Sequence, residues 1–343
     1  MDELQPPSQP KILIIRLSSI GDIVLTTPVV RAVNEQLPEA KVHFLVRKVH
    51  FLVRKDLVSV VENNPHIHKI HIYDPENVSQ TIDELRQEQF TVVVDLQKTL
   101  RSRKVVRSLK VPSYTFSKHN LSKWICYRLK MNGMPETHIV ERYFEAVKDL
   151  NVHNDHKGLE FYIPENQGFE EDDLPMMFED GFVAIVLAAQ HFTKRIPVSK
   201  VVEIGSILHK PIMLLGGKDV YEEGEQVVAQ LGERATNGCG KYTLYQSAAI
   251  LQHADCVITG DTGLMHISAA LHKPTAAIFG ATIPEYGYYP YMPGERDKFR
   301  NFEVCPLNCR PCSKFGSSKC RRKHFKCMKN ISATEVAEWV NKF

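Results

Sequence analysis

The sequence predicts an α/β protein with two domains, each built around a parallel β-sheet. Short apolar runs alternate with amphipathic helical patterns along most of the chain, and strands that alternate with helices form parallel sheets covered on both faces. With 343 residues, the chain is long for one hydrophobic core, because domains commonly hold about 100 to 150 residues. A polar, weakly patterned stretch over residues 151–181 separates two series of these elements. We expect the linker there.

The first series opens with KILIIRL at residues 11–17, a pattern typical of a buried parallel strand, which runs into a turn and a helical pattern. The elements expected after it are strands over 69–73 and 91–95, a basic helix over 98–109, and helices over about 79–89 and 138–150. The second series is expected to contain strands over 183–187, 212–215, 256–259 and 275–279, and helices over about 199–208, 220–231, 244–252 and from 264. Thr243 with Gln246, and Ser332 with Glu335, resemble helix-capping pairs.

These elements give the expected domain boundaries. The N-terminal domain covers residues 1–165 and the C-terminal domain covers 166–330. A terminal helix over 331–343 is expected to pack back on the N-terminal domain.

The heptapeptide KVHFLVR occurs twice in tandem, at residues 41–47 and 48–54. In a strand, an insertion of seven residues reverses the face of every later side chain, whereas in a helix it is nearly two whole turns. We therefore expect one copy in a strand and the other in the following loop or helix.

Composition argues against a membrane-spanning segment and leaves two interpretations of the basic patches open. No apolar run of about 18 residues occurs, and the N-terminus is acidic and proline-rich, so we expect a cytoplasmic protein. Residues 96–135 hold ten Lys/Arg and no acid, and residues 304–334 hold eight more without an acid. Such patches suit nucleic acid or a phosphorylated membrane surface, although a solvated helix face explains them equally well.

Five of the eight cysteines lie between Cys305 and Cys327. The spacing of Cys309 and Cys312 is found in zinc sites, and Cys320, Cys327 and His324 follow. Because five is odd, the cluster cannot pair fully into internal disulfides. A structural metal on Cys309, Cys312, Cys320 and Cys327, a pair of disulfides and reduced thiols all remain open, and the lack of a second close pair disfavours the metal.

Two strand-turn-helix motifs carry candidate chemistry. In RLSSIGDIVLTTP, Gly21 and Asp22 begin a helix after an apolar strand, although an acid there often only complements the positive helix end. In ITGDTGLMHISAAL, Asp261 and Thr262 follow a strand, at the sheet edge where ligands of parallel sheets bind. The helix N–H groups and Thr262 could bind phosphate, whereas Asp261 could be a plain N-cap.

Further candidates end the neighbouring strands. The next strand runs into Thr282, so two strands present small residues at the same edge. His266 lies on nearly the same helix face as Thr262, where a ligand contact and a hydrogen-bonded packing role are both open. Lys194 could neutralise a diphosphate, and Asp219 after LLGG could accept from ribose hydroxyls. The dinucleotide, P-loop and D-x-D patterns are absent, which argues against nicotinamide cofactors, P-loop phosphoryl transfer and a metal-bridged diphosphate.

The motifs RLSSIGDIVLTTPVVRAV, VVVDLQKTLRSRK, HIVERYFEAV, TKRIP, GDTGLMHISAAL and KPTAAIFGAT, in this order, resemble the lipopolysaccharide heptosyltransferase family over nearly the whole chain. The resemblance implies a GT-B fold, in which two Rossmann-like domains face each other across a cleft. It also implies inverting transfer of heptose from ADP-heptose to the inner core of lipopolysaccharide, without a cofactor.

The resemblance assigns roles residue by residue. Asp22 corresponds to the catalytic base. The implied donor contacts are Lys194, Asp219, Tyr242, Asp261, Thr262, Gly263, Leu264, His266 and Thr282. The implied acceptor contacts are Ser19, Gly21, Lys98 and Arg101. Ile196 stands where the family usually has Trp, and LAAQ replaces the common Pro-Gly-Ala, which puts the particular sugar in doubt.

The expected partners are ADP-heptose and a lipid A-core acceptor at the inner membrane surface, with no nucleic acid. The anionic acceptor fits the basic patch between Lys98 and Lys130. A GT-B transferase that uses another nucleotide sugar for a cell-surface glycan is the closest alternative. A non-enzymatic nucleic-acid-binding protein is the distant one, since no recognition motif of that class occurs.

Overall fold

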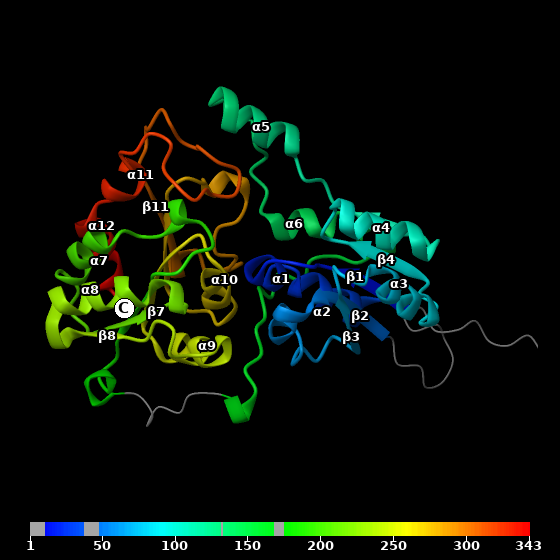
Figure 1. Ribbon diagram of the computed structural model, residues 1–343, viewed down its shortest axis with the longest axis horizontal. Helices are drawn as coiled ribbons and strands as arrows, with labels where there is room; N and C mark the ends of the chain where they lie inside the picture. The colour runs from blue at the N-terminus through cyan, green and yellow to red at the C-terminus, as the bar shows by residue number, and fades with distance from the viewer. Residues whose placement is uncertain (1–10, 38–47, 132, 168–174) are drawn as a thin grey trace, which may run out of the picture. The chain divides into compact units, whose positions relative to one another are not determined.

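The computed structural model describes residues 11–37, 48–131, 133–167 and 175–343, which form two compact units (Figure 1). The first unit takes the described residues up to Lys118 together with Ile139–Lys157. The second takes His119–His138 and Gly158–Phe343. Each unit contains one sheet whose strand pairs are all parallel.

The sheet of the first unit has the strand order β3-β2-β1-β4-β5. Its strands are β1 (Lys11–Ile15), β2 (Lys48–Arg54), β3 (Lys69–Tyr73), β4 (Val92–Asp95) and β5 (Ser113–Thr115). The helices are α1 (Ile20–Val24), α2 (Thr27–Gln36), α3 (Val78–Gln87), α4 (Leu100–Leu109) and α6 (Ile139–Phe144), with short 3-10 turns at Lys55–Val60 and Lys148–Leu150. Because strand side chains alternate between faces, Leu13 and Ile15 pack with Leu85 and Val105 of α3 and α4 in one hydrophobic cluster.

The sheet of the second unit has the order β11-β10-β9-β6-β7-β8. Its strands are β6 (Val183–Val186), β7 (Ile212–Leu215), β8 (Ala235–Asn237), β9 (Cys256–Gly260), β10 (Thr275–Phe279) and β11 (Phe299–Glu303). The helices are α5 (Asn120–Leu129), α7 (Val198–Gly205), α8 (Tyr221–Leu231), α9 (Leu244–His253), α10 (Gly263–Ala270), α11 (Lys326–Lys329) and α12 (Ala333–Val340). Short 3-10 turns lie at Glu165–Gln167, Met176–Phe178, Phe192–Lys194, Lys218–Val220, Gly232–Arg234, Pro284–Tyr286 and Arg296–Lys298.

The two faces of this sheet have separate cores. Ile185, Leu214 and Ile258 point to the face covered by α7, α8 and α12, and Ala277 and Phe279 pack with Met265 of α10 on the other. The caps predicted from sequence form as expected. Thr243 and Gln246 exchange bonds of 3.2 and 3.0 Å, and Ser332 accepts from the Glu335 N–H at 3.2 Å.

Most predicted elements are present within two or three residues, and the differences have local causes. The short strands β5, β8 and β11 and the helix α5 were not predicted, since SYT and ATN have no apolar run. The predicted helix over 138–150 ends at Phe144 and continues as a 3-10 turn. The second KVHFLVR copy is the strand β2, whereas the first copy and residues 168–174 of the expected linker lie outside the described residues.

The expectation that the terminal helix returns to the N-terminal domain is wrong. Helix α12 belongs to the second unit, where Val336 and Val340 join the cluster formed by α7 and the sheet. Apolar residues on one face of α12 find their burial there. The units also divide at Lys118, Ile139 and Lys157, so α5 belongs to the second unit although it precedes the expected boundary at residue 165.

Within the described residues, no helix is both long and apolar enough to span a bilayer.

Candidate active site

Each sheet has a topological switch point, where the strand order reverses. In the first unit this point lies between β1 and β4, and in the second between β6 and β9. Ligands of open parallel sheets bind outside the carboxyl ends of the strands at such points. The candidate residues from the sequence follow these strands: Asp22 follows β1, Lys194 follows β6 and Asp261 follows β9.

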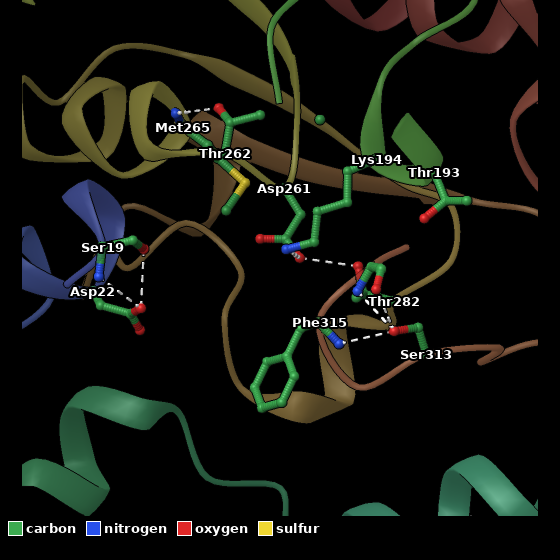
Figure 2. Close-up of polar contacts among 12 residues, drawn as sticks. Ser19, Asp22, Thr193, Lys194, Asp261, Thr262, Met265, Thr282, Ser313 and Phe315 are labelled. Atoms are coloured by element: carbon green, nitrogen blue, oxygen red, sulfur yellow. Dashed lines mark hydrogen bonds and ion pairs between the residues drawn. The ribbon is translucent and has the colours of Figure 1, made fainter. Parts of the chain in front are cut away.

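At the first switch point, Asp22 sits in the first turn of α1, where Ser19 and Arg16 hold its carboxylate; Figure 2 shows the contact with Ser19. Its Oδ2 accepts from the Ser19 N–H at 3.2 Å and from the Ser19 hydroxyl at 3.0 Å. Its Oδ1 lies 2.7 Å from Nη2 of Arg16, and 26% of the Asp22 side chain remains exposed. The carboxylate is therefore oriented by the chain and still reachable by a ligand.

The electrostatics of this site keep Asp22 ionised. Burial raises the pKa of its carboxyl, but the Arg16 guanidinium and the two Ser19 hydrogen bonds together outweigh burial and lower the pKa below its ordinary value. A carboxylate that carries no proton near neutral pH is available as a proton acceptor.

Arg16 links the ends of the two central strands. It is buried, and its Nε donates to the Ser18 carbonyl at 2.9 Å while Nη1 donates to the Leu96 carbonyl at 2.5 Å. Leu96 directly follows β4, so the guanidinium fixes the position of the turn that carries Asp22 relative to β4. Sequence reasoning did not single out Arg16, although an arginine that ends an otherwise apolar strand was a usable signal.

The other predicted acceptor residues of the first unit divide into fixed and free side chains. Ser19 caps α1 and Gly21 is buried in its first turn. The Lys98 ammonium donates to the Phe116 carbonyl at 2.6 Å, while Arg101 is exposed at the start of α4. Of the two cations, Arg101 is therefore the one whose side chain is exposed to solvent.

Lys118 was counted in the basic patch but not proposed as a site residue. Burial and the nearby Arg16 lower the pKa of its ammonium to about 8, although Asp95 and Asp22 act in the opposite direction. It therefore belongs to the charged surroundings of Asp22, within the same unit. Partial burial of a lysine beside an arginine is the physical signal, and it exists only in the folded chain.

At the second switch point, three strand ends contribute one polar cluster (Figure 2). The Lys194 ammonium lies 2.7 Å from Oδ2 of Asp261, and the Thr282 hydroxyl donates to the same oxygen at 2.9 Å. Thr282 is buried, and the Lys194 and Asp261 side chains are 16% and 12% exposed. These contacts confirm the prediction that the ends of neighbouring strands bring their side chains together here.

The turn between β9 and α10 is closely packed. A Cβ on Gly260 would lie 2.3 Å from the Lys194 carbonyl oxygen, so only glycine lets the Lys194 segment approach. Thr262 caps α10 by accepting from the Met265 N–H at 3.3 Å, which leaves the first helix N–H groups, at Gly263 and Leu264, without partners inside the helix. His266 is buried in α10.

Arg310, in the basic segment after β11, holds the turn that carries Thr282. It is buried and donates to the carbonyls of Gly280, Phe279 and Thr282 at 2.6, 3.1 and 3.0 Å. It also pairs with Glu303 at 2.8 Å. Sequence reasoning placed Arg310 in a surface patch, because nothing local distinguishes it from its exposed neighbours.

Asp219 and Tyr242 also lie in the second unit. Asp219 is paired with Arg195, a partner that the sequence could not supply. Tyr242 lies against Gly238, where a Cβ would approach its ring to 2.7 Å, and burial raises the pKa of its hydroxyl.

All eight cysteines are described and all are free thiols. The Cys309 sulfur lies 3.9 Å from Nε2 of His324. Among the described residues, only His50, His71 and Glu88 bring three potential ligand atoms within 4.8 Å of one another. Glu88 there is paired with Lys11 and Lys69, whose positive charges oppose a bound cation. These ammonium groups disfavour a cation at the histidine cluster, and the metal alternative for the cysteine-rich segment stays a prediction.

The fold and the comparisons define a glycosyltransferase of the GT-B class, with two Rossmann-type parallel-sheet domains. A solved glycosyl transferase family 9 structure from Veillonella parvula aligns with a TM-score of 0.74 at 19% identity, over 99% of this chain and 98% of the other. The structure of Escherichia coli ADP-heptose lps heptosyltransferase II aligns with a TM-score of 0.70 at 18% identity, over 97% and 98%.

The particular family follows from sequence. The profile of glycosyltransferase family 9 (heptosyltransferase) matches residues 78–319, and the chain belongs to this family. Among curated relatives, lipopolysaccharide heptosyltransferase 1 of Campylobacter coli is 24% identical over 302 residues, covering 80% of this chain and 85% of that protein.

Proposed function

We propose that this chain is an inverting glycosyltransferase that transfers heptose from ADP-heptose to the inner core of lipopolysaccharide. The observation that carries the proposal is the pair of polar clusters at the carboxyl ends of the two sheets. One offers an oriented, ionised carboxylate at Asp22, and the other offers an ammonium and a hydroxyl group at Lys194 and Thr282. The first suits an alcohol to be deprotonated and the second suits a phosphate.

In the proposed reaction, Asp22 removes the proton from an acceptor sugar hydroxyl as its oxygen attacks the anomeric carbon of the donor. The bond from that carbon to the diphosphate oxygen breaks, and the electron pair leaves with ADP. A single displacement inverts the anomeric centre. The low pKa of Asp22 makes it ready but weakly basic, so proton transfer accompanies C–O bond formation and does not precede it.

The donor half stabilises the leaving group. Negative charge grows on the diphosphate in the transition state, so the Lys194 ammonium and the first N–H groups of α10 bind that state better than the ground state. Asp261 is itself anionic and would repel a phosphate at close range. Its contacts with Lys194 and Thr282 therefore make it a positioning residue, which holds both groups until the diphosphate replaces it as their partner.

The nucleotide assignment is supported by a relative. The solved structure titled E. coli heptosyltransferase WaaC with ADP has the same fold, with a TM-score of 0.61 over 85% of this chain. Transfer of another sugar by the same machinery is the second candidate, because Ile196 and the LAAQ segment replace residues common in the family.

The test is incubation of the protein with ADP-heptose and a heptose-deficient core acceptor, followed by mass spectrometry. A product heavier by one heptose supports the proposal. No product with ADP-heptose, together with turnover of another nucleotide sugar, would support the second candidate instead.

Asp22→Asn provides the matched variant, since it keeps the size and removes the base. We expect turnover to fall by about a thousandfold, within the range of about 10²–10⁴ that a general base commonly contributes. ADP affinity should change little. Weaker ADP binding with appreciable residual turnover would show that Asp22 is not the base.

A further inference from the structure

Helix α5, over Asn120–Leu129, exposes large apolar side chains to solvent. Leu121, Trp124 and Leu129 are 71%, 45% and 54% exposed, and Met131 just after the helix is 63% exposed. These are among the most exposed large apolar side chains of the described residues. Leu121 and Trp124 are three residues apart and therefore lie on neighbouring parts of one helix face.

The inward side of the same helix carries its anchoring groups. Cys126 packs in a cluster with Met134, Ile283 and Tyr286. Lys123 is buried, with its ammonium 4.8 Å from the ring centre of Tyr288. An ordinary surface helix buries its apolar stripe and exposes its lysines. In α5, by contrast, Lys123 is buried while Leu121 and Trp124 are exposed, so the orientation of the helix leaves apolar side chains in water.

The cysteine-rich segment 305–327 adjoins this helix within the same unit. Arg321 donates to the Tyr127 hydroxyl at 3.1 Å, and the Lys130 ammonium donates to the Cys309 carbonyl at 3.4 Å. Phe315 in this segment is 64% exposed. Helix α5 and the segment thus form one surface, which we call the α5 surface.

The α5 surface carries charge of one sign. Arg128 is exposed on α5, and the exposed basic residues of the segment are Lys319, Arg321, Arg322, Lys323 and Lys326. Residues 119–135 and 304–334 contain no Asp or Glu. An exposed tryptophan and leucines bordered by cations are the signature of an element that lies in a membrane interface, with the apolar groups in the acyl boundary and the cations among anionic headgroups.

We propose that the α5 surface binds the face of a phospholipid bilayer that contains anionic lipids. A second copy of this chain fits it less well, because a two-fold interface would bring identical basic patches together. The inference goes beyond the proposed function, and it rests on this surface alone.

Trp124 makes the proposal directly measurable. The chain has two tryptophans, and Trp339 is only 7% exposed, so a change in emission on adding vesicles reports mainly Trp124. With vesicles of phosphatidylethanolamine and phosphatidylglycerol we expect a blue shift and co-sedimentation. Both should weaken at high salt and be at least tenfold weaker with vesicles of phosphatidylcholine alone.

The test variant is Leu121→Glu/Leu129→Glu, which keeps Trp124 as the probe. We expect it to lose at least tenfold in vesicle affinity and to lose the blue shift. Met176→Glu/Ile207→Glu is the matched control, since it adds the same charge at positions that are 81% and 38% exposed in other elements. The control should bind as the unmodified protein does, and thermal unfolding should be the same for all three.

Three results would overturn the proposal: equal loss in the two variants, binding that does not depend on anionic lipid, or absence of binding to any vesicle. Self-association that only Leu121→Glu/Leu129→Glu disrupts, without vesicle binding, would identify a second copy as the partner instead. Transfer to a water-soluble, lipid-free acceptor should continue in every variant. Its failure would therefore count against the proposed function and not against the membrane surface.

Discussion

Nη2 of Arg16 lies 2.7 Å from Oδ1 of Asp22, and the same guanidinium donates to the Leu96 carbonyl. One buried cation therefore sets both the position of the proposed base and its proton affinity. This coupling distinguishes a catalytic role of Asp22 from a role in capping α1. If Asp22 only capped the helix, a change at Arg16 would not alter the pH dependence of turnover.

Arg16→Gln should move the acid limb of the kcat/KM profile to higher pH. Arg16 lowers the pKa of Asp22, so its removal raises that pKa, and a higher pH is needed to ionise the base. Measuring kcat/KM between pH 3 and 8 locates this acid limb. An unchanged acid limb in a folded variant would exclude Asp22 as the group seen there.

The lowered pKa of Lys118 predicts a second change in the kinetics, on the alkaline side of the pH profile. The pKa of its ammonium is about 8, lowered by burial first and by Arg16 next, so it is charged below that pH and neutral above it. If the acceptor is anionic, its KM should rise as the pH passes about 8. Lys118→Arg should carry the low KM to higher pH, since guanidinium stays protonated. Lys104→Arg, at an exposed position on α4, should leave the profile unchanged.

Gly260→Ala tests whether catalysis depends on the position of the Lys194 segment. The added Cβ would lie 2.3 Å from the Lys194 carbonyl oxygen, so this backbone must move. Misplacement by about 1 Å can cost about a hundredfold in rate, and we expect kcat/KM for the donor to fall about ten- to a hundredfold. Gly133→Ala, where a Cβ meets nothing within 4 Å, is the control. Equal kinetics in the two variants would contradict the role of Lys194.

Arg310→Lys should loosen the turn that carries Thr282. A lysine cannot donate to three carbonyls and the Glu303 carboxylate from a fixed fork. We expect a loss of about 2–4 kcal/mol in the free energy of unfolding and a higher KM for the donor. Urea unfolding and donor kinetics measure the two effects, with Arg296→Lys at an exposed position as control. An unchanged free energy of unfolding with a normal KM for the donor would show that the turn keeps its conformation without Arg310.

The sequence predicted those parts of the site that are local to a motif. Asp22 stands in the first turn of α1 and Thr262 caps α10, as the strand-turn-helix patterns indicate. Asp261 and Thr282 meet because parallel strands end at one edge. The missed residues depend on distant contacts. Arg310 reaches back about thirty positions to Gly280, and its basic neighbours made it look like surface. In α5, similarly, Leu121 and Trp124 are exposed while Lys123 is buried, so the apolar pattern does not show which side of the helix is covered.

Helix α5 was assigned to the N-terminal domain for the same reason. Residues 119–138 lie between two segments of the first unit, yet their contacts are with Ile283, Tyr286 and the segment after β11. Apolar periodicity reports that a face is buried but not which partner buries it. Helix α12 illustrates this point too, since its cap was predictable and its partner was not.

The buried pair of His50 and His71 predicts that stability falls in acid. Nδ1 of His50 lies 2.8 Å from Nε2 of His71, and burial, with His71 next, lowers the pKa of His50 from 6.5 to about 4. The folded state thus binds fewer protons than the unfolded state between these values. The contribution of neutral His50 to the free energy of unfolding is fully present above pH 6.5 and is lost as the pH falls through 4. The loss amounts to about 3 kcal/mol. Urea unfolding at a series of pH values measures this slope.

His50→Asn should flatten that slope, because asparagine does not titrate and its amide can still hydrogen-bond to His71. His209→Asn, at an exposed position, is the matched control and should keep the slope of the unmodified protein. His71 is also buried and its pKa is also lowered, so part of the acid dependence should survive in His50→Asn and disappear only when both residues are replaced. A slope that is the same in all variants would show that other groups govern acid unfolding.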